Sequence, residues 1–426
     1  MKTRYTDVLI VGAGPTGLAL ATALQAAGID HQIIDGRAEG ANTSRAAVIH
    51  AHTLEMLEPL GVVPDLHKVG LTLSRFTLRE RDTPLIQLSF DQLPSKYQHI
   101  LMLPQDQTEA ILATRLEALG GAIRRKVTAV SASQEADHVI VRTSRTDGEE
   151  NIKARFVVGA DGMHSTMRAA TSIQFEGDSY GESFVLADVR MDWPLGPTEV
   201  SLSFSPAGLV VIAPLPDGSF RIVATMDKAP EVPTIDHIQN LLDQRGPKLS
   251  PGRVTEVAWG SRFRVHHRLA SSYREGRILL MGDAAHVHSP AGGQGMNAGL
   301  VDAMVLAEAL VAVIGNGATL STLDEYAHLR RPAAGEVLVL ASRLTSMATI
   351  RPIVLRKARN MVLRLLGHLP AFKRKLALQL SGVSRRHLSK LSRPKQIVPE
   401  AVWSALAQRS AAAMRTTDQR RFDVAA

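Results

Sequence analysis

The chain has 426 residues, of which 45% are hydrophobic and 21% charged, and it contains no cysteine. This size and composition predict a globular protein with two or more domains or subdomains. The lack of cysteine excludes disulfides, thiolate nucleophiles and cysteine-ligated metal centres. No stretch reaches the roughly 18 uncharged apolar residues of a spanning helix, and the N-terminal apolar run is shorter than a signal-peptide core of about 7 to 15 residues. We therefore expect a soluble, cytoplasmic protein.

The net charge of +8 comes from one segment near the C-terminus. Fourteen lysines and arginines and no acidic residue lie between Glu336 and Glu400, whereas the rest of the chain has 35 basic and 41 acidic residues. Apolar residues recur there at helical spacing, with arginines between them, which predicts an amphipathic basic helix. We favour a helix docked on the body with its arginines in solvent, with attachment to a membrane surface or an acidic partner as the alternative. No nucleic-acid recognition motif accompanies the charge, so we expect no nucleic-acid partner.

The first predicted elements are a strand at residues 7–11, a helix ending near residue 27 and a strand at residues 31–35. The turn between the first strand and the helix reads Gly12-Ala13-Gly14-Pro15-Thr16-Gly17. In this context Gly12 allows a tight turn, Gly14 lets the backbone approach a pyrophosphate, and Gly17 permits close packing. Asp35, at the end of the next strand, is placed to accept hydrogen bonds from a ribose. The unit therefore predicts a bound adenine dinucleotide.

The next part of the chain alternates between short helices and strands. We expect a loop and helix over residues 41–61, strands between 71 and 103, and a helix over 105–119. Strands at 127–130 and 139–143 form a small meander. A buried strand at 156–159 then leads into the sequence GADGMHSTMR, residues 159–168.

Between residues 175 and 265 the hydrophobic period changes to two, which predicts an antiparallel sheet. Its strands are expected at 199–204, 208–213 and 219–225, with a hairpin turn at residues 216–218. A strand at 277–281 and a helix at 296–315 follow, and the tail beyond 325 is mostly helical with a break at Arg331-Pro332. We expect a discontinuous nucleotide-binding domain (1–174 and 266–330), a substrate-binding sheet (175–265, with a contribution from 71–103) and a basic helical C-terminal region (331–426).

A second glycine-rich loop follows the strand at 277–281. It reads GDAAHVHSPAGGQGMNAG, residues 282–299, and its last glycines precede a helix N-terminus, where bare amides and the helix dipole favour an anion or a polarised carbonyl. Residues 293–298 fit G-x-G-x-x-A, yet the preceding strand ends about ten residues earlier and no strand ending in an acid follows about 20 residues later. A single dinucleotide accounts for both loops: the N-terminal loop would hold its pyrophosphate, and Asp283 with the later glycines would hold its distal half. A dinucleotide with a polyol chain and a ring that becomes anionic on reduction is FAD.

Three segments carry a family resemblance: GAGPTG with Asp35, GADGMHSTMR, and GDAAHVHSP with GGQGMNAG. Together they resemble the fingerprints of the single-component, class A FAD-dependent aromatic hydroxylases, typified by para-hydroxybenzoate and phenol hydroxylases. The resemblance spans residue 5 to about residue 330. It implies an α/β fold with a Rossmann-like, glutathione-reductase-like FAD-binding domain, an inserted antiparallel sheet for the substrate, and a helical C-terminal tail.

The resemblance also implies roles for matching residues. Asp35 would bind the adenosine ribose, Asp283 the ribityl chain, and Pro290 would lie beside the isoalloxazine. Asp161 would brace the pyrophosphate loop and bear on NAD(P)H use, with support from Arg168. Arg45 and Gln105 would approach the pyrophosphate and ribityl regions, and residues 293–297 would face the pyrimidine edge of the ring. The full set implied to bind the cofactor is Gly12, Gly14, Pro15, Thr16, Gly17, Asp35, Arg45, Gln105, Val127 (through its backbone, to adenine), Asp161, Gly162, Arg168, Gly282, Asp283, Pro290, Gly293, Gly295, Met296 and Asn297.

In the family, NADH or NADPH reduces the flavin, dioxygen forms a C4a-hydroperoxide, and one oxygen atom passes to an electron-rich ring. The chemistry is the cofactor's, so no protein nucleophile is required, and the sequence identifies no general base. We expect an aromatic, phenolic or polyketide-like substrate. The alternatives are an FAD-dependent dehydrogenase or reductase without oxygen insertion, and a non-catalytic FAD-binding protein.

Other site classes have less support. His286 and His288 have H-x-H spacing, but no carboxylate pattern completes a metal site, so we expect no metal. Ser165 follows His164 without a nucleophile elbow, which disfavours a hydrolase. No second G-x-G-x-x-G remains for NAD(P)H, which implies a transient site or a partner reductase. The thioredoxin-like C-terminal domain of larger phenol-hydroxylase relatives has no counterpart in this sequence, so their mode of oligomerisation does not carry over. We expect a monomer or a homodimer.

Overall fold

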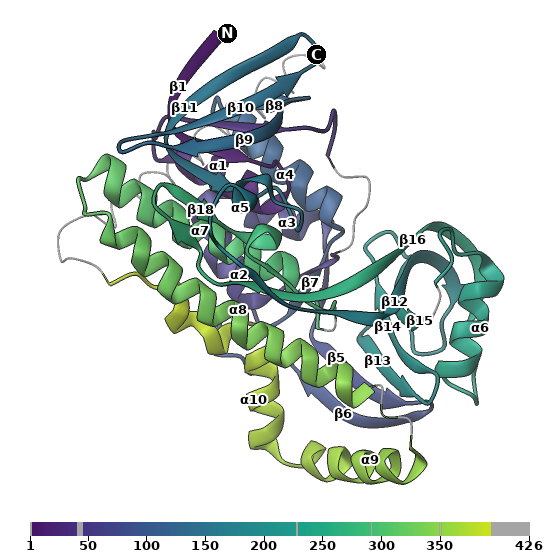
Figure 1. The fold of residues 1–426 in the computed structure, drawn as a ribbon. Coiled ribbons are helices and arrows are strands. Elements are labelled where there is room, and N and C mark those ends of the chain that lie inside the picture. The colour runs from purple at the N-terminus through teal and green to yellow at the C-terminus, as the bar shows by residue number, and fades with distance from the viewer. Residues whose placement is uncertain are drawn as a thin grey trace, which may run out of the picture.

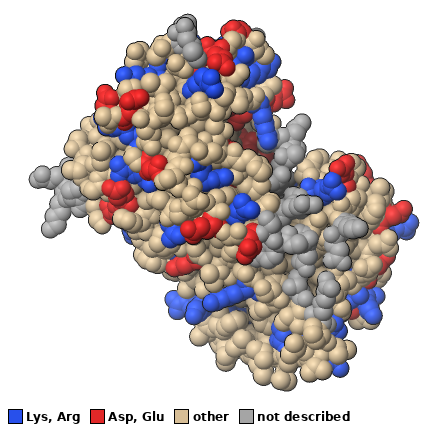
Figure 2. All heavy atoms as spheres, in the orientation of Figure 1, with Lys and Arg blue, Asp and Glu red and all other residues tan. Residues whose placement is uncertain are grey.

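The computed structural model describes residues 2–40, 46–226, 229–290, 292–348, 350 and 352–392. Within them the strands form two eight-stranded sheets and one three-stranded sheet. Figure 1 shows the first large sheet at the upper end of the molecule and the second at the lower right, with long helices running beside both. Acidic and basic side chains are scattered among uncharged ones over the upper part of the face in Figure 2.

The first sheet has a parallel centre, as the predicted strand–helix–strand unit requires. Its main path runs β17-β18-β11-β1-β2-β8, and β10 and β9 extend it from β11 as antiparallel strands. The central strands end in short buried apolar runs, Val8 to Val11 in β1 and Phe156 to Val158 in β11, as expected of strands that helices cover. The strands are β1 (Lys2–Val11), β2 (His31–Asp35), β8 (Ile123–Arg125), β9 (Thr128–Gln134), β10 (Val139–Arg145), β11 (Gly148–Gly159), β17 (Arg274–Glu275) and β18 (Ile278–Leu280).

Helices α1 (Pro15–Ala26), α4 (Gln105–Ala118) and α7 (Gly295–Gly315) pack together beside this sheet, with α1 in contact with both of the others. Among the described residues α7 is the one helix long and apolar enough to cross a membrane, but 78% of its apolar window is buried inside the protein. A helix that is apolar on all sides and enclosed by other elements is a core helix. Because most of α7 is buried, the position of the N-terminus of α7 is fixed by packing.

The second sheet runs β19-β16-β12-β15-β14-β13-β5-β6. The strands expected from the period of two are present, but the sheet is not wholly antiparallel, because β13 pairs with β5 in parallel. β5 comes from the earlier 71–103 region and reaches β13 across the fold, so no hairpin forces an antiparallel pairing. The strands are β5 (Arg75–Glu80), β6 (Thr83–Ser89), β12 (Phe175–Asp192), β13 (Val200–Ser205), β14 (Gly208–Pro214), β15 (Phe220–Met226), β16 (Arg253–Ala270) and β19 (His286–Val287).

Several shorter elements complete the body. Sequence patterns did not predict α6 (Ile235–Arg245), which a capping box at Thr234 begins and which packs on β16. The other elements are β3 (Val48–Ile49), α2 (Ala51–Leu57), η1 (Glu58–Leu60), α3 (Val63–Val69), β4 (Leu71–Leu73), β7 (Ile100–Met102), α5 (Thr166–Ala169) and η2 (Gly282–Ala284), with β3, β7 and β4 forming the three-stranded sheet.

The C-terminal part that the structure describes, up to residue 392, is helical as expected, and residues 393–426 lie outside the described residues; the predicted break at Arg331-Pro332 is wrong. Helix α8 (Ser321–Ala348) continues through Pro332, and buried residues lie on both sides of it, including Tyr326 and Val337. This packing outweighs the roughly 3 kcal/mol that an interior proline costs a helix. The elements that follow are α9 (Ile353–Gly367), α10 (Pro370–Leu380) and η3 (Val383–Ser389).

Candidate active site

The three motifs of the sequence meet at one edge of the first sheet. β1 ends at Val11, which pairs with Gly159 at the end of β11, and Gly159 pairs in turn with Leu280 at the end of β18. Because these strands are parallel, the loops that follow them all emerge on the same side. Ligands of open α/β sheets bind in this position, outside the carboxyl ends of the strands.

The glycines of the first loop serve different purposes. Gly12 has a φ of +107°, and a Cβ there would lie 2.3 Å from the carbonyl oxygen of Ala160; a Cβ on Gly17 would lie 2.0 Å from the carbonyl oxygen of Gly12. Both positions are therefore closed by the protein itself. Gly14 has no atom within 4 Å of such a Cβ, and it begins α1 without a side-chain cap. The first amides of α1 are thus left for a ligand.

Asp35 at the end of β2 lies against this loop. Its Oδ2 accepts a 2.8 Å hydrogen bond from the backbone N–H of Ala13, and its Oδ1 accepts one of 2.8 Å from the N–H of Arg37. Each carboxylate oxygen has a further acceptor site. The backbone N–H of Val127 donates to the carbonyl of Asp35 at 3.0 Å. If Val127 contacts adenine through its backbone, it therefore does so through its own carbonyl.

The geometry says little about cofactor binding by Gln105 and Arg45. Gln105 is half-buried at the start of α4, and its Nε2 donates to Oε1 of Glu109 at 2.8 Å. Arg45 lies outside the described residues.

The Asp-Gly motif after β11 begins the short helix α5. Oδ2 of Asp161 accepts hydrogen bonds from the N–H groups of Thr166 at 2.7 Å and Met167 at 3.2 Å, while its Oδ1 is buried without a hydrogen-bond partner among the described residues. Burial raises the pKa of Asp161 by more than its hydrogen bonds lower it. Gly162, with φ +80° and open space around it, leaves the adjoining backbone accessible.

Arg168 joins two of the loops. Its Nη1 donates to the carbonyl of Ala284 at 2.7 Å and its Nη2 to the carbonyl of Met163 at 2.7 Å. Its guanidinium also lies 3.8 Å from the ring centroid of Phe175. Arg168 therefore fixes the loop after β18 relative to the loop after β11.

The second glycine-rich segment touches the first one directly. A Cβ on Gly282 would lie 2.9 Å from Oγ1 of Thr16, and a Cβ on Gly299 would lie 2.4 Å from the same atom. These two glycines let η2 and α7 approach the start of α1. Asp283 beside them is exposed, and Pro290 further along is half-buried.

Helix α7 also begins without a side-chain cap, so the first amides of this long helix have no side-chain partner at the cap. A Cβ on Gly293 (φ +61°) would lie 2.2 Å from Cγ1 of Val48, whereas around Gly295 nothing lies nearer than 3.9 Å. Gly293 is closed by packing, and Gly295 is open. Met296 is buried.

The side chain of Asn297 is used inside the protein. Its Oδ1 accepts from the N–H of His50 at 2.8 Å, and its Nδ2 donates to the carbonyls of Val48 at 2.9 Å and Gly293 at 2.8 Å. It ties β3 and the glycine loop to α7. If Asn297 faces a ligand, it does so through its backbone.

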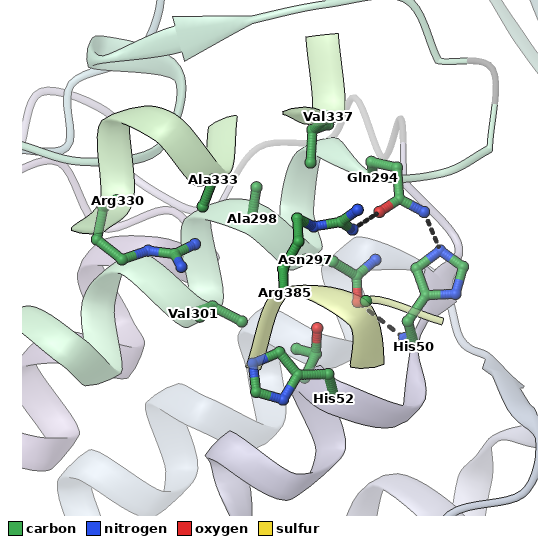
Figure 3. A pocket seen from close by; sticks show the side chains of 12 residues that line it. His50, His52, Gln294, Asn297, Ala298, Val301, Arg330, Ala333, Val337 and Arg385 are labelled. Atoms are coloured by element: carbon green, nitrogen blue, oxygen red, sulfur yellow. Dashed lines mark hydrogen bonds between the residues drawn. The ribbon is translucent and has the colours of Figure 1, made fainter. Parts of the chain in front are cut away.

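Behind the α7 N-terminus lies a polar brace that the sequence motifs did not reveal. Figure 3 shows Arg385 directed at Gln294, and Gln294 at His50. Oε1 of Gln294 accepts from Arg385 at 2.7 Å, and Nε2 of His50 lies 3.0 Å from the carbonyl oxygen of Gly292. The adjoining cavity of about 20 Å³ has room for a water molecule, not for a dinucleotide. Burial lowers the pKa of His50 to about 4, so it is neutral at pH 7.

A second buried network holds His286. Its Nε2 lies 2.7 Å from Oδ2 of Asp302, whose Oδ1 accepts from Nε of Arg330 at 2.8 Å, and all three side chains are buried. Burial raises the pKa of Asp302, but the charges of Arg330 and His286 outweigh it, so the net pKa is lowered. The described residues contain no group of three or more potential metal ligands.

These features fit one extended dinucleotide. Two uncapped helix N-termini and the exposed carboxylate of Asp283 lie on loops that contact one another. A pyrophosphate suits the first N-terminus, a polyol suits the carboxylate, and a ring with developing negative charge suits the second N-terminus. Those are the parts of FAD.

Comparisons with known proteins agree with this geometry. A family model described as FAD binding domain matches residues 5–341. The chain is 36% identical over 378 residues to 6-methylpretetramide 4-monooxygenase of Streptomyces rimosus, covering 87% of this chain and 67% of that protein. It is 32% identical over 340 residues to pentachlorophenol 4-monooxygenase of Sphingobium chlorophenolicum, covering 78% and 63% of the two chains.

Among solved structures, p-nitrophenol 4-monooxygenase from Pseudomonas putida DLL-E4 superposes with a TM-score of 0.82 at 26% identity. The match covers 92% of this chain and 100% of that one. The fold, the motifs and the relatives agree: this chain belongs to the family of class A FAD-dependent aromatic hydroxylases and is an FAD-dependent monooxygenase.

Proposed function

We propose that this monooxygenase consumes NADH or NADPH and inserts one atom of dioxygen into an aromatic, phenolic or polyketide-like small molecule. Relatives named for pentachlorophenol, anhydrotetracycline and rifampicin support this substrate class. The observation that carries the proposal is the meeting of three loops at the carboxyl edge of one parallel sheet, with two uncapped helix N-termini among them.

In the proposed complex the open amides after Gly14 bind the pyrophosphate. The remaining acceptor sites of Asp35, whose Oδ2 also lies 3.9 Å from Nη1 of Arg125, bind the ribose. The exposed carboxylate of Asp283 binds the ribityl chain, and Pro290 lies beside the isoalloxazine. When bound, FAD supplies the redox chemistry and the activation of dioxygen. The protein residues bind and orient the cofactor and exclude water.

The N-terminus of α7 is placed to stabilise negative charge on the reduced flavin. Its amides at Gly295 and Met296 are backed by a helix of 21 residues, whose dipole is equivalent to roughly half a positive charge at this end. Such a fixed donor array stabilises negative charge on the pyrimidine side of the reduced ring. The neutral His50 and the clamp of Asn297 hold the array in place.

We infer that substrate selectivity comes from the second sheet, residues 175–265, with residues 71–103. A buried arginine joins this sheet to the flavin side of the molecule. Arg221 on β15 makes two 2.7 Å bonds to the carboxylate of Asp188 on β12, and its Nη1 donates to the carbonyl of Ala46 at 2.8 Å. Since Ala46 is two residues before β3, the sheet is anchored beside the proposed ring site.

The remaining assignments are also proposals. The domain boundaries at residues 174/175, 265/266 and 330/331, a cytoplasmic location, and a monomeric or homodimeric state all stay predictions. A transient nicotinamide site, without a second dinucleotide loop, is expected for the reducing co-substrate.

The test is oxygen uptake by the purified FAD-loaded protein with NADH or NADPH and a panel of phenols and polycyclic phenolic compounds. We expect uptake that at least one compound stimulates and a product that has gained one oxygen atom. A product without added oxygen would favour the dehydrogenase alternative. If neither NADH nor NADPH reduces the flavin in the presence of any compound, a non-catalytic FAD-binding protein would be favoured.

A further inference from the structure

Helix α9 packs on the body through the opposite side to the one expected from the sequence: its polar side faces the protein and its apolar side faces outward. Its buried residues are Arg359, Asn360 and Leu363, so two of the three are polar. They face β6 and its surroundings, and Figure 1 shows α9 at the lower end of the molecule, away from the first sheet. The helix therefore rests on the body through a largely polar side.

Specific contacts hold that polar side. Arg356 Nε lies 3.1 Å from Oε1 of Glu80, and Asn360 donates to the same carboxylate. The guanidinium of Arg359 lies 4.8 Å from the ring centroid of Phe204, and its Nη1 donates to the carbonyl of Met347 at 2.7 Å. Since these arginines are engaged inward, the orientation of the helix is fixed, and its other side faces outward.

The outward side is apolar. At 3.6 residues per turn, Val354, Ala358, Met361 and Leu365 lie on the side opposite the buried residues. Val354 is 73% exposed, Met361 61% and Leu365 62%. Ile353, Leu355, Val362 and Leu369 are also exposed large apolar residues of this region. A contiguous exposed apolar patch of this kind marks an interaction surface.

Cations border the patch. Lys357 and Arg364 lie on one flank of α9, and Arg374 and Lys375 on α10 follow in the chain; all four are exposed and have no ion-pair partner in the described part of the chain. No acidic residue occurs between positions 337 and 399. The lower end of the molecule in Figure 2 shows uncharged and basic side chains on this face.

From this arrangement we propose that α9 docks on an anionic membrane surface. An apolar stripe flanked by lysine and arginine is the pattern of helices that lie in the headgroup layer, where apolar burial and attraction to acidic lipids add. A second copy fits less well, because a two-fold contact brings the same cationic face together. The chain's own residues 393–426 fit less well too, since their six basic residues outnumber three acidic ones.

The test is co-sedimentation of the FAD-loaded full chain with vesicles of phosphatidylcholine, with or without phosphatidylglycerol. We expect binding that requires the anionic lipid and weakens with added salt. The double variant Met361→Ser/Leu365→Ser should bind at least about tenfold more weakly, because it removes the centre of the buried stripe. Lys357→Gln/Arg364→Gln should lose about fivefold per cation.

The matched control is Tyr5→Ser/Val130→Ser, which removes two exposed large side chains of β1 and β9 in the first sheet, at the other end of the molecule from α9 (Figure 1), and should leave binding unchanged. Flavin absorbance and oxygen uptake without vesicles should equal those of the unaltered protein in every variant, which shows that folding is intact. Absence of binding to anionic vesicles, or equal binding by the α9 variants, would overturn the proposal. So would a concentration-dependent dimer, seen by sedimentation velocity, that the α9 substitutions abolish.

Discussion

Gly12, Gly14 and Gly17 occupy one short turn, yet each is glycine for a different physical reason. Gly12 and Gly17 are closed by backbone atoms 2.3 Å and 2.0 Å from where a Cβ would lie, while Gly14 faces open space. The spacing of the motif predicts the local contact of Gly17 with Gly12 and the open approach at Gly14, whereas Gly12 is closed by Ala160 from the loop after β11. The matching role of Gly282 and Gly299, which make room for Thr16, could not be predicted, because that contact exists only in the folded chain.

Because Gly14 faces open space, replacing it should weaken FAD binding without destabilising the fold. Gly14→Ala meets no atom, so it should change the unfolding free energy of the flavin-free protein by no more than about 1 kcal/mol. Its methyl group should still lower FAD affinity at least tenfold by occupying the pyrophosphate approach, as flavin fluorescence titration measures. Gly335→Ala, in open space within α8, is the control and should leave affinity unchanged. Normal FAD binding by Gly14→Ala would mean that the pyrophosphate lies elsewhere.

His50 predicts a pH dependence of stability. Burial lowers its pKa from 6.5 to about 4, so the folded protein binds fewer protons than the unfolded chain between these values. The unfolding free energy should therefore fall as the pH drops from about 6.5 to about 4, by up to about 3 kcal/mol. Urea unfolding of the flavin-free protein measures this, and the loss over that range should be smaller in His50→Gln. Parallel pH curves for the two proteins would contradict the assignment.

At the scale of elements, the strands and helices with strong periodicity were predictable, and the exceptions have tertiary causes. Packing on both sides of Pro332 keeps α8 continuous, and the parallel pairing of β13 with β5 joins segments far apart in the chain. α9 was correctly predicted as an amphipathic basic helix, but its orientation was not. The sequence pattern cannot reveal that Glu80 and Phe204 receive its arginines.

The N-terminus of α7 depends on a clamp that no motif reveals. Asn297→Ala should remove three buried hydrogen bonds and lower the unfolding free energy by about 2–4 kcal/mol. FAD affinity should fall as well, because β3 and the glycine loop are no longer tied to the helix. Asn316→Ala, at the other end of α7, removes one bond of 3.5 Å and is the control, with an expected change below about 1 kcal/mol. Equal effects of the two substitutions would contradict the clamp.

At the scale of the whole molecule, the C-terminal helices are part of the site's support. Arg330 on α8 pairs with Asp302 on α7, and Arg385 on η3 donates to Gln294 at the α7 N-cap. The three motifs predicted loops that meet at the carboxyl edge of the first sheet, because each motif directly follows one of its parallel strands. They did not predict this support, because its residues come from distant helices and carry no motif.

Breaking the buried pair should destabilise the entire chain. Arg330→Met leaves Asp302 charged and fully buried, with His286 as its ion-pair partner among the described residues and one hydrogen bond from the N–H of Gly282, at an expected cost of about 3–5 kcal/mol in unfolding free energy. Arg343→Met, at an exposed position of the same helix, should cost less than about 0.5 kcal/mol. Chemical denaturation of both variants checks this. A cost below about 1 kcal/mol for Arg330→Met would show that the pair does not hold α8 to α7.

The central claim is that both glycine-rich loops hold a single FAD. Asp283→Ala tests it most directly, since Asp283 is exposed and its loss should leave the fold intact. The control is Asp236→Ala, at an exposed position in the first turn of α6 on the second sheet. The measurement is the flavin-to-protein ratio after purification. We predict one flavin per chain in the unaltered and control proteins and loss of most of it in Asp283→Ala; full occupancy in Asp283→Ala would contradict the account.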